Sequence, residues 1–125
     1  MTAHSHHDVV IVGARCAGAT LATLVARTGA SVLLLDKDRL PSDQILSTHC
    51  IHPPGVDVLD QVGVGNAVRA VSPPTHIVRL RKNDAIVDYE FGEGRAEYCP
   101  RRQRLDGLLQ DAATSAGVEL LDQSE

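Results

Sequence analysis

The chain has 125 residues, of which 43% are hydrophobic and 22% are charged, and this composition is typical of one small globular domain rather than of a disordered segment. A net charge of −4, with two tyrosines, one phenylalanine and no tryptophan, argues against a nucleic-acid-binding protein, which needs a basic face and stacking side chains. The sequence has no transmembrane segment and no signal peptide, so we expect a cytoplasmic chain with a disordered leader at residues 1–7.

The cysteines and histidines predict neither a disulfide framework nor a metal site. Cys16, Cys50 and Cys99 are widely separated and odd in number, and none belongs to a C-x-x-C pair. This usage fits a reducing cytoplasm. His49 and His52 stand beside Cys50, but two imidazoles and one thiol lack the fourth ligand of a structural zinc site. We therefore expect no metal, and we expect Cys16 to be a small buried packing residue.

The chain opens with a predicted β-α-β unit. Residues 9–12 are an uninterrupted β-branched run, which is typical of a strand covered on both faces. Residues 17–28 follow with helical periodicity and many small side chains, and Gly29 stands where a helix-terminating glycine belongs. Residues 31–35 are a second apolar strand, which ends at Asp36. Two parallel strands joined by a crossover helix are the expected result.

The alternation of strands and helices is then interrupted. Residues 40–50 are polar and irregular, and a helix is predicted from Pro53 to about Gly63, because proline suits a first helical turn. Residues 66–71 add a further helical turn. Residues 76–81 and 85–89 alternate with period two on either side of Asn83-Asp84, which predicts an antiparallel hairpin.

The last part of the chain predicts a helix over residues 102–116 and a third parallel strand over residues 118–121. The face expected to be buried on this helix consists of Leu105, Leu108, Leu109, Ala112 and Ala116. The whole pattern predicts an α/β fold: a parallel sheet with a β-α-β start, an inserted loop and helix, and an antiparallel hairpin.

The turn after the first strand predicts a dinucleotide-binding site. The usual pattern is G-x-G-x-x-G, and here Gly13 and Gly18 keep its ends while Arg15 replaces its middle glycine. Asp36 follows Gly13 by 23 residues, close to the spacing of a carboxylate that binds ribose hydroxyls. Its charge would repel a 2′-phosphate, which favours FAD or NAD over NADP. The alternative is a nucleotide-free α/β domain in which Asp36 is a solvated strand end.

Three stretches carry a resemblance to a known family. "DVVIVGARCAGATLATLVARTGASVLLLDKD" resembles the N-terminal FAD-binding segment of the glutathione-reductase-like flavoproteins, within them most of all the geranylgeranyl reductase branch, close to the aromatic-ring hydroxylases. "LSTHCIHPPGVDVLDQVGV" is similar to the loop and helix that follow there, and "PRRQRLDGLLQDAATSAGVEL" to the segment before the third strand. That branch includes turns of the G-A-R-x-A-G type. The resemblance implies a Rossmann-like FAD-binding domain over residues 8–125, incomplete at its C-terminus and with the substrate domain absent.

The resemblance also implies which residues bind FAD. Those expected around the diphosphate are Gly13, Ala14, Arg15, Ala17 and Gly18. Asp36 would hold the adenosine ribose, and Lys37 would lie beside the adenine. Ser47 and Thr48 would approach the ribityl chain or the flavin, and Arg102 matches a family arginine that contacts FAD.

The function implied is that of the FAD-binding part of a flavin-dependent oxidoreductase. In the full-length family, NADH or NADPH would reduce the flavin, and the enzyme would reduce an isoprenoid-like double bond or hydroxylate a small organic substrate. An NAD-binding dehydrogenase domain is the second hypothesis, and a non-catalytic remnant or interaction module is the third. No catalytic side chain is predicted, because no nucleophile motif is present and the flavin itself carries the chemistry. Whether the 125-residue chain alone is an enzyme stays open.

Overall fold

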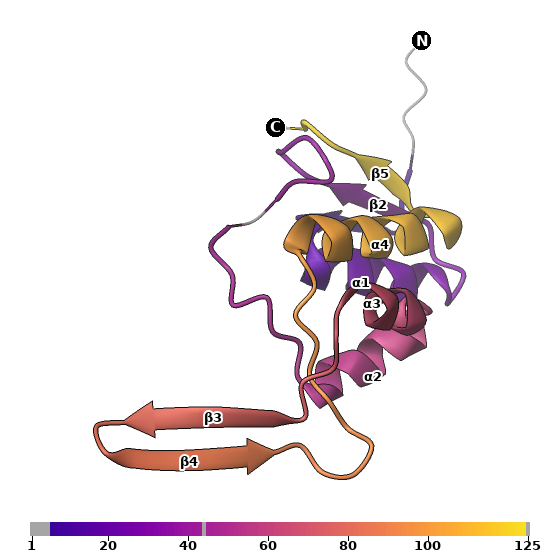
Figure 1. The fold of residues 1–125 in the computed structure, drawn as a ribbon. Helices are drawn as coiled ribbons and strands as arrows, with labels where there is room; N and C mark the ends of the chain where they lie inside the picture. The colour runs from indigo at the N-terminus through magenta and orange to yellow at the C-terminus, as the bar shows by residue number, and fades with distance from the viewer. Residues whose placement is uncertain (1–5, 44, 125) are drawn as a thin grey trace. The chain divides into compact units, whose positions relative to one another are not determined.

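The computed structural model describes residues 6–43 and 45–124 (Figure 1). In chain order the elements are β1 (Val9–Val12), α1 (Cys16–Ala26), β2 (Val32–Leu35), α2 (Pro53–Val62), α3 (Gly65–Val71), β3 (Ile77–Lys82), β4 (Ala85–Glu90), α4 (Arg102–Ser115) and β5 (Glu119–Leu121). The chain divides into two compact units: the first runs up to Ile45 and resumes at Arg102, and the second covers Leu46–Arg101. Of the expected leader, residues 1–5 lie outside the described residues, and His7 Nε2 lies 2.9 Å from a carboxylate oxygen of Glu119.

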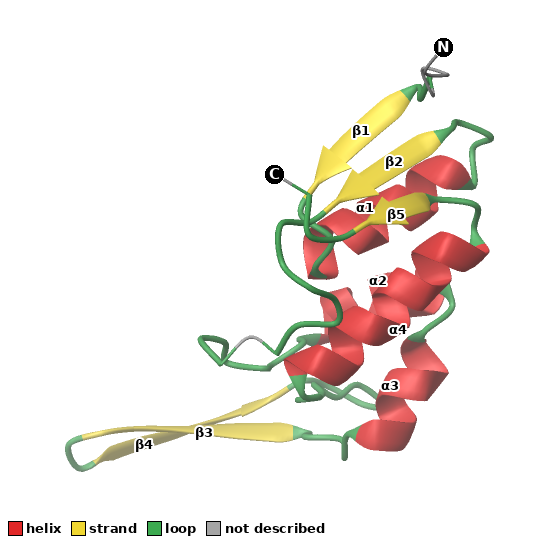
Figure 2. Ribbon diagram, turned by 90° about the horizontal axis from the view of Figure 1, so that it is seen from above, coloured by secondary structure: helices red, strands yellow, loops and turns green. Residues whose placement is uncertain are grey.

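The first unit is a parallel three-stranded sheet in the order β1-β2-β5, as the α/β prediction requires. Residues Val9–Val12 pair in register with Val32–Leu35, and Leu34 pairs with Leu120. Helices α1 and α4 pack against each other on one face of the sheet (Figure 1 and Figure 2). On the other face, the side chains of Val10 and Val12 are 55% and 82% exposed.

The helix-covered face of the sheet holds the core of the first unit. Ile11 and Leu34 point into it, and the fully buried Ala19 and Ala22 allow α1 to lie close to the strands. Helix α1 ends two residues before the predicted residue 28. The Thr28 amide and hydroxyl both donate to the Val25 carbonyl, at 2.9 Å and 2.7 Å, so Thr28 closes a tight turn rather than extending the helix.

The predicted buried face of α4 is wrong in part. Leu105 and Leu109 are buried, but Leu108 and Ala112 are only half-buried, and so is Ala116, which follows the last helical residue, Ser115. The remaining buried positions are Asp106, Gln110 and Ala113. The helix is rotated from the purely apolar arrangement, because Asp106 forms a hydrogen bond with Cys16 at the start of α1 and Gln110 forms one with the turn before it.

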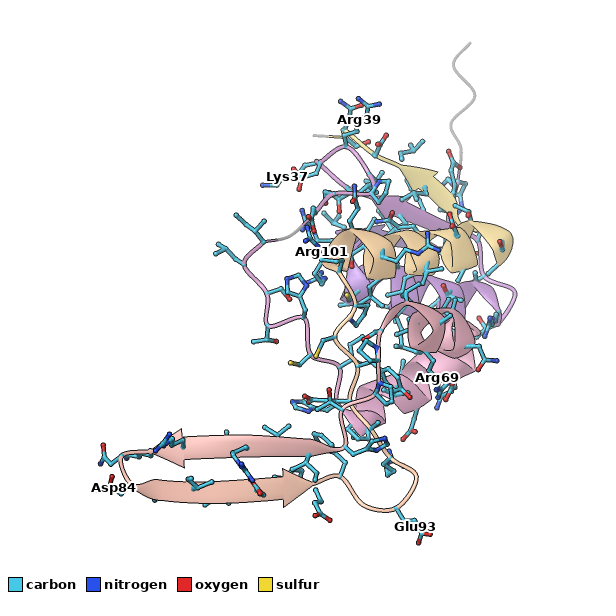
Figure 3. All side chains as sticks on the ribbon, in the orientation of Figure 1. Lys37, Arg39, Arg69, Asp84, Glu93 and Arg101 are labelled. Atoms are coloured by element: carbon cyan, nitrogen blue, oxygen red, sulfur yellow. The ribbon has the colours of Figure 1, made fainter. Side chains whose placement is uncertain are left out.

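The second unit contains α2, α3 and the β3-β4 hairpin. Helix α2 begins at Pro53 and ends at Val62, and the φ of +89° at Gly63 then turns the chain out of the helix. The α2 carboxylate of Asp60 and the α3 guanidinium of Arg69, which is labelled in Figure 3, form a bidentate ion pair with both N–O distances 2.7 Å. The hairpin turns at Asn83-Asp84 as predicted, and Asn83 takes a φ of +54°.

Candidate functional site

The turn between β1 and α1 requires glycine at both of its ends. Gly13 takes a φ of +102°, a region that side-chain-bearing residues rarely adopt, and its amide donates to the Leu35 carbonyl at 2.7 Å. A Cβ atom added to Gly18 would overlap the Gly13 carbonyl oxygen. Gly18 therefore lets the first turn of α1 press directly on the chain that leaves β1.

The N-terminus of α1 offers backbone donors that the helix itself does not use. The first hydrogen bond of the helix runs from the Ala19 amide to the Arg15 carbonyl at 2.9 Å, so the amides of Cys16, Ala17 and Gly18 precede it. The helix dipole gives this end a partial positive charge, and the first turn carries no acidic side chain. Such an end is suited to bind a phosphate or another anion.

Asp36 fastens the end of β2 to the glycine turn. Its Oδ2 accepts a hydrogen bond from the Ala14 amide at 2.7 Å, and its Oδ1 accepts one from the Asp38 amide at 2.9 Å. The residue is only 5% exposed, so the alternative of a solvated strand end is wrong. A carboxylate can accept about four hydrogen bonds, so these two leave capacity for a ligand.

Arg15 stands at the N-cap of α1 and turns its guanidinium toward the end of β2. Its Nη2 lies 2.6 Å from Oδ2 of Asp38. Its Nη1 is buried and has no hydrogen-bond partner among the described residues. A buried cationic N–H without an acceptor is costly, so its position points to a group that completes the site.

These groups surround one cavity of about 730 Å³, a volume within the usual range for cofactor sites. Its lining residues are Val12, Gly13, Arg15, Ala17, Gly18, Leu35, Asp36, Lys37, Asp38 and Ser124. Lys37 is exposed, and its side chain extends away from the sheet (Figure 3). Ala14 does not line the cavity, because it is fully buried beneath the turn.

Helix α4 supports the glycine turn from beneath, which was not predicted. The Gln110 side-chain amide donates to the Ala14 carbonyl at 2.7 Å, and Oδ1 of Asp106 accepts a hydrogen bond from the Cys16 thiol at 3.0 Å. Arg102 Nη2 lies 3.2 Å from Oδ2 of Asp106. Arg102, Asp106 and Gln110 recur at every fourth residue, and this polar stripe was the available sequence signal.

Cys16 is not an activated thiol. Burial raises its pKa from the ordinary value of 9.0 to about 12, and the hydrogen bond to the Asp106 carboxylate adds to the rise. The helix N-terminus would lower the pKa of a thiol, but the loss of hydration outweighs that effect here. The thiol stays protonated at neutral pH and serves as a hydrogen-bond donor within the first unit.

Ser47 and Thr48 belong to the second unit, whereas the residues that line the cavity belong to the first. Ser47 Oγ accepts a hydrogen bond from the His49 amide at 3.1 Å, and Thr48 Oγ1 accepts one from the Cys50 amide at 3.4 Å. Both side chains therefore shape their own loop.

The histidines that flank Cys50 in the sequence do not gather around it as ligands. Among the described residues, the groups with metal-binding atoms within 4.8 Å of one another are Cys50, Glu97 and Cys99. His52 Nδ1 lies 3.0 Å from Oε2 of Glu97.

The second unit has a cavity of its own, of about 590 Å³. It is lined by His52, Pro53, Pro54, Val78, Leu80, Tyr89, Phe91 and Arg95. Helix α2 starts at this cavity, but its first two residues are prolines, which have no amide hydrogen to offer a phosphate. The anion-binding features are therefore found at the first cavity, and the second is mainly apolar.

Known proteins are similar to this chain in sequence and in fold. The family model described as "FAD binding domain" matches residues 6–125. The chain is 34% identical over 65 residues to a squalene monooxygenase of Rattus norvegicus, covering 52% of this chain and 11% of the relative. It is 30% identical over 109 residues to the FAD-dependent monooxygenase nodM of Hypoxylon pulicicidum, covering 80% of this chain and 23% of the relative. The chain thus spans less than a quarter of either relative.

Comparison with solved structures also finds flavoproteins. The myxobacterial chondrochloren halogenase CndH, described as a variant of FAD-dependent halogenases, superposes with a TM-score of 0.83 at 27% identity, covering 94% of this chain and 28% of that one. A flavoprotein/dehydrogenase from Cytophaga hutchinsonii superposes with a TM-score of 0.79 at 26% identity, covering 93% and 30%. Among the described residues, no helix is long and apolar enough to cross a bilayer. The chain belongs to the FAD binding domain family, which confirms the predicted cofactor and fold class.

Proposed function

We propose that the cavity at the start of α1 holds the adenosine diphosphate part of FAD within a flavin-dependent monooxygenase. The observation that carries this proposal is the meeting of three unlike groups at one cavity. These are the free amides of α1, the buried carboxylate of Asp36 and the buried, unpartnered Nη1 of Arg15. Together they match an anionic diphosphate joined to a ribose that carries hydroxyl donors.

The diphosphate would be held from two sides. The amides of Cys16, Ala17 and Gly18 would donate to its oxygens, and Gly13 and Gly18 keep the backbone free of side chains where the cofactor approaches. Arg15 would add a cation, donating its unpaired N–H to the cofactor while Asp38 holds the other arm of the guanidinium.

Asp36 would bind the ribose. The carboxylate is already oriented by the amides of Ala14 and Asp38, so no further ordering is needed when it accepts the ribose hydroxyls. Its charge would reject a 2′-phosphate. Lys37 at the cavity and Arg102 beside Asp106 remain proposed FAD contacts, as do Ser47 and Thr48 in the second unit.

Bound FAD supplies the redox chemistry, and the residues of this chain bind and orient it. We propose NADH or NADPH as the electron donor and a small, apolar organic molecule as the substrate. The names of the squalene monooxygenase and FAD-dependent monooxygenase relatives support hydroxylation or epoxidation over double-bond reduction. The mainly apolar cavity of the second unit supports an apolar substrate.

We also propose a cytoplasmic location, which the three free cysteines support.

Calorimetric titration of the chain with FAD, ADP, FMN and NAD⁺ tests this proposal. FAD and ADP should compete for one site, and FMN should leave that site free. Tighter binding of NAD⁺ than of FAD would favour the dehydrogenase alternative, and no binding of either would favour a non-catalytic module. For the electron donor, anaerobic bleaching of the flavin absorbance by NADH or NADPH in the FAD-loaded protein is the readout.

A further inference from the structure

Two cysteines in the second unit lie opposite each other on adjacent backbone segments. Ile51 and Tyr98 form an antiparallel bridge, with Ile51 N to Tyr98 O at 2.8 Å and Tyr98 N to Ile51 O at 3.1 Å. Because these two residues exchange both hydrogen bonds, the next pair outward, Cys50 and Cys99, occupies a non-hydrogen-bonded position. Side chains at such positions lie closest together.

The two sulfur atoms are already in contact. The Cys99 thiol donates to Sγ of Cys50 at 3.5 Å, and both residues are exposed. A disulfide needs an S–S distance of about 2.05 Å, so closing it requires a shift of about 1.5 Å, within reach of side-chain rotation. The Cys99 amide donates to the hydroxyl of buried Ser72 at 2.8 Å, which holds the backbone in place.

We propose that Cys50 and Cys99 form a reversible dithiol–disulfide modification site whose oxidant is a low-molecular-weight disulfide of the glutathione type. The Cys50 thiolate attacks one sulfur of oxidised glutathione, forming a mixed disulfide and releasing one glutathione. The Cys99 thiol then loses its proton, attacks Sγ of Cys50 and releases the second glutathione. Two thiols are oxidised to one disulfide, and one molecule of oxidised glutathione is reduced to two of glutathione.

The surroundings assign the second step to Cys99. Partial loss of hydration, with contributions from Cys50 and Glu97, raises the pKa of Cys99 to about 11, so this thiol is protonated at neutral pH. It is therefore a poor first nucleophile, but its sulfur is already placed against Cys50 to resolve a mixed disulfide.

The disulfide would close a loop that contains nearly all of the second unit. Cys50 lies two residues before His52, and His52 and Pro53 line the apolar cavity of this unit. Oxidation would therefore fix the entry to α2 and one wall of that cavity.

Redox titration of the full chain tests the proposal. The protein is incubated with mixtures of oxidised and reduced glutathione in the presence of a chelator, free thiols are alkylated, and the products are identified by intact mass and peptide mapping. The native chain should lose two hydrogens and yield a Cys50–Cys99 peptide, while Cys16 stays a thiol. The oxidised chain should also show a higher midpoint of thermal unfolding than the reduced one.

Matched variants distinguish specific pairing of Cys50 with Cys99 from the general reactivity of exposed thiols. Cys99→Ser should stop at a mixed disulfide between Cys50 and glutathione, whereas Cys50→Ser should form a mixed disulfide only slowly, because Cys99 is the poorer first nucleophile. Cys16→Ser should form the internal disulfide as readily as the wild type. In guanidinium the selective pairing should disappear. The proposal is overturned if both thiols stay free in excess oxidised glutathione, if the native wild type accumulates mixed disulfides, or if pairing is equally selective in the denatured chain.

Discussion

Replacing Asp36 separates its two roles, because the carboxylate fastens the glycine turn and is also the proposed ribose ligand. Asp36→Ala removes the acceptor of the Ala14 amide, and Ala14 is fully buried, so water does not replace it. A hydrogen bond to a charged group contributes about 1.5–3 kcal/mol. The second bond, to the Asp38 amide, is part-buried and contributes less. Asp36→Ala should therefore lower the free energy of unfolding by about 3 kcal/mol, and Asp36→Asn, which keeps one acceptor oxygen, by roughly half of that.

Thermal unfolding followed by circular dichroism measures the first role, and the expected decrease of the midpoint for Asp36→Ala is roughly 10 °C. Calorimetry with FAD, well below the midpoint of every variant, measures the second role. The affinity for FAD should fall by about tenfold to a hundredfold, the equivalent of one hydrogen bond to a charged group. Asp111→Ala, at an exposed aspartate on α4, is the control and should change neither quantity.

The two measurements can refute the two roles separately. An unchanged midpoint in Asp36→Ala would show that the bonds to the turn contribute nothing to stability. A decreased midpoint with unchanged FAD affinity would retain the structural role and refute the ribose contact.

The remaining predictions concern the turn and its supports. Arg15→Gly restores the usual glycine pattern but removes a cation, so FAD affinity should fall by about tenfold and depend less on salt; tighter binding would show that Arg15 is merely tolerated. Gly18→Ala should abolish FAD binding and destabilise the chain, because the new Cβ overlaps the Gly13 carbonyl oxygen. Gly107→Ala on α4 meets only ordinary contacts and should stabilise the chain by up to about 1 kcal/mol. Equal melting midpoints for Gly18→Ala and Gly107→Ala would contradict the close approach of Gly18 to Gly13. Cys16 has a folded pKa of about 12 and an ordinary value of 9.0, so its contribution to stability is complete below pH 9 and is lost as the pH rises toward 12. The free energy of unfolding of the wild type relative to Cys16→Ser should therefore decline above pH 9. If the two free energies of unfolding change with pH in parallel, the raised pKa of Cys16 is refuted.

The sequence predicted the β-α-β unit well because its signals are local. The apolar runs of the two strands, the small residues of α1 and the spacing from Gly13 to Asp36 are all set within neighbouring elements. The periodicity of α4 was ambiguous, since Leu108 and Ala112 fit a helical face as well as Asp106 and Gln110 do.

Contacts between distant residues decide what local patterns leave open. Gln110 binds the Ala14 carbonyl across 96 residues of sequence, and Cys50 meets Cys99 across 49. The strand pairing and the position of the turn, which appear only in the folded chain, create both contacts. The buried state of Asp36 likewise follows from the turn that wraps around it, whereas a strand-ending aspartate alone gives no such indication.

The most direct test of the FAD site is a map of backbone amide resonances in the isotope-labelled chain during titration with FAD. We predict that the amides of Cys16, Ala17 and Gly18 shift in proportion to FAD bound, since these donors precede the first hydrogen bond of α1. ADP should move the same resonances, and Gly18→Ala should abolish the shifts. If FAD saturates the chain while these amides keep their positions, the cofactor binds elsewhere and the account of the site is wrong.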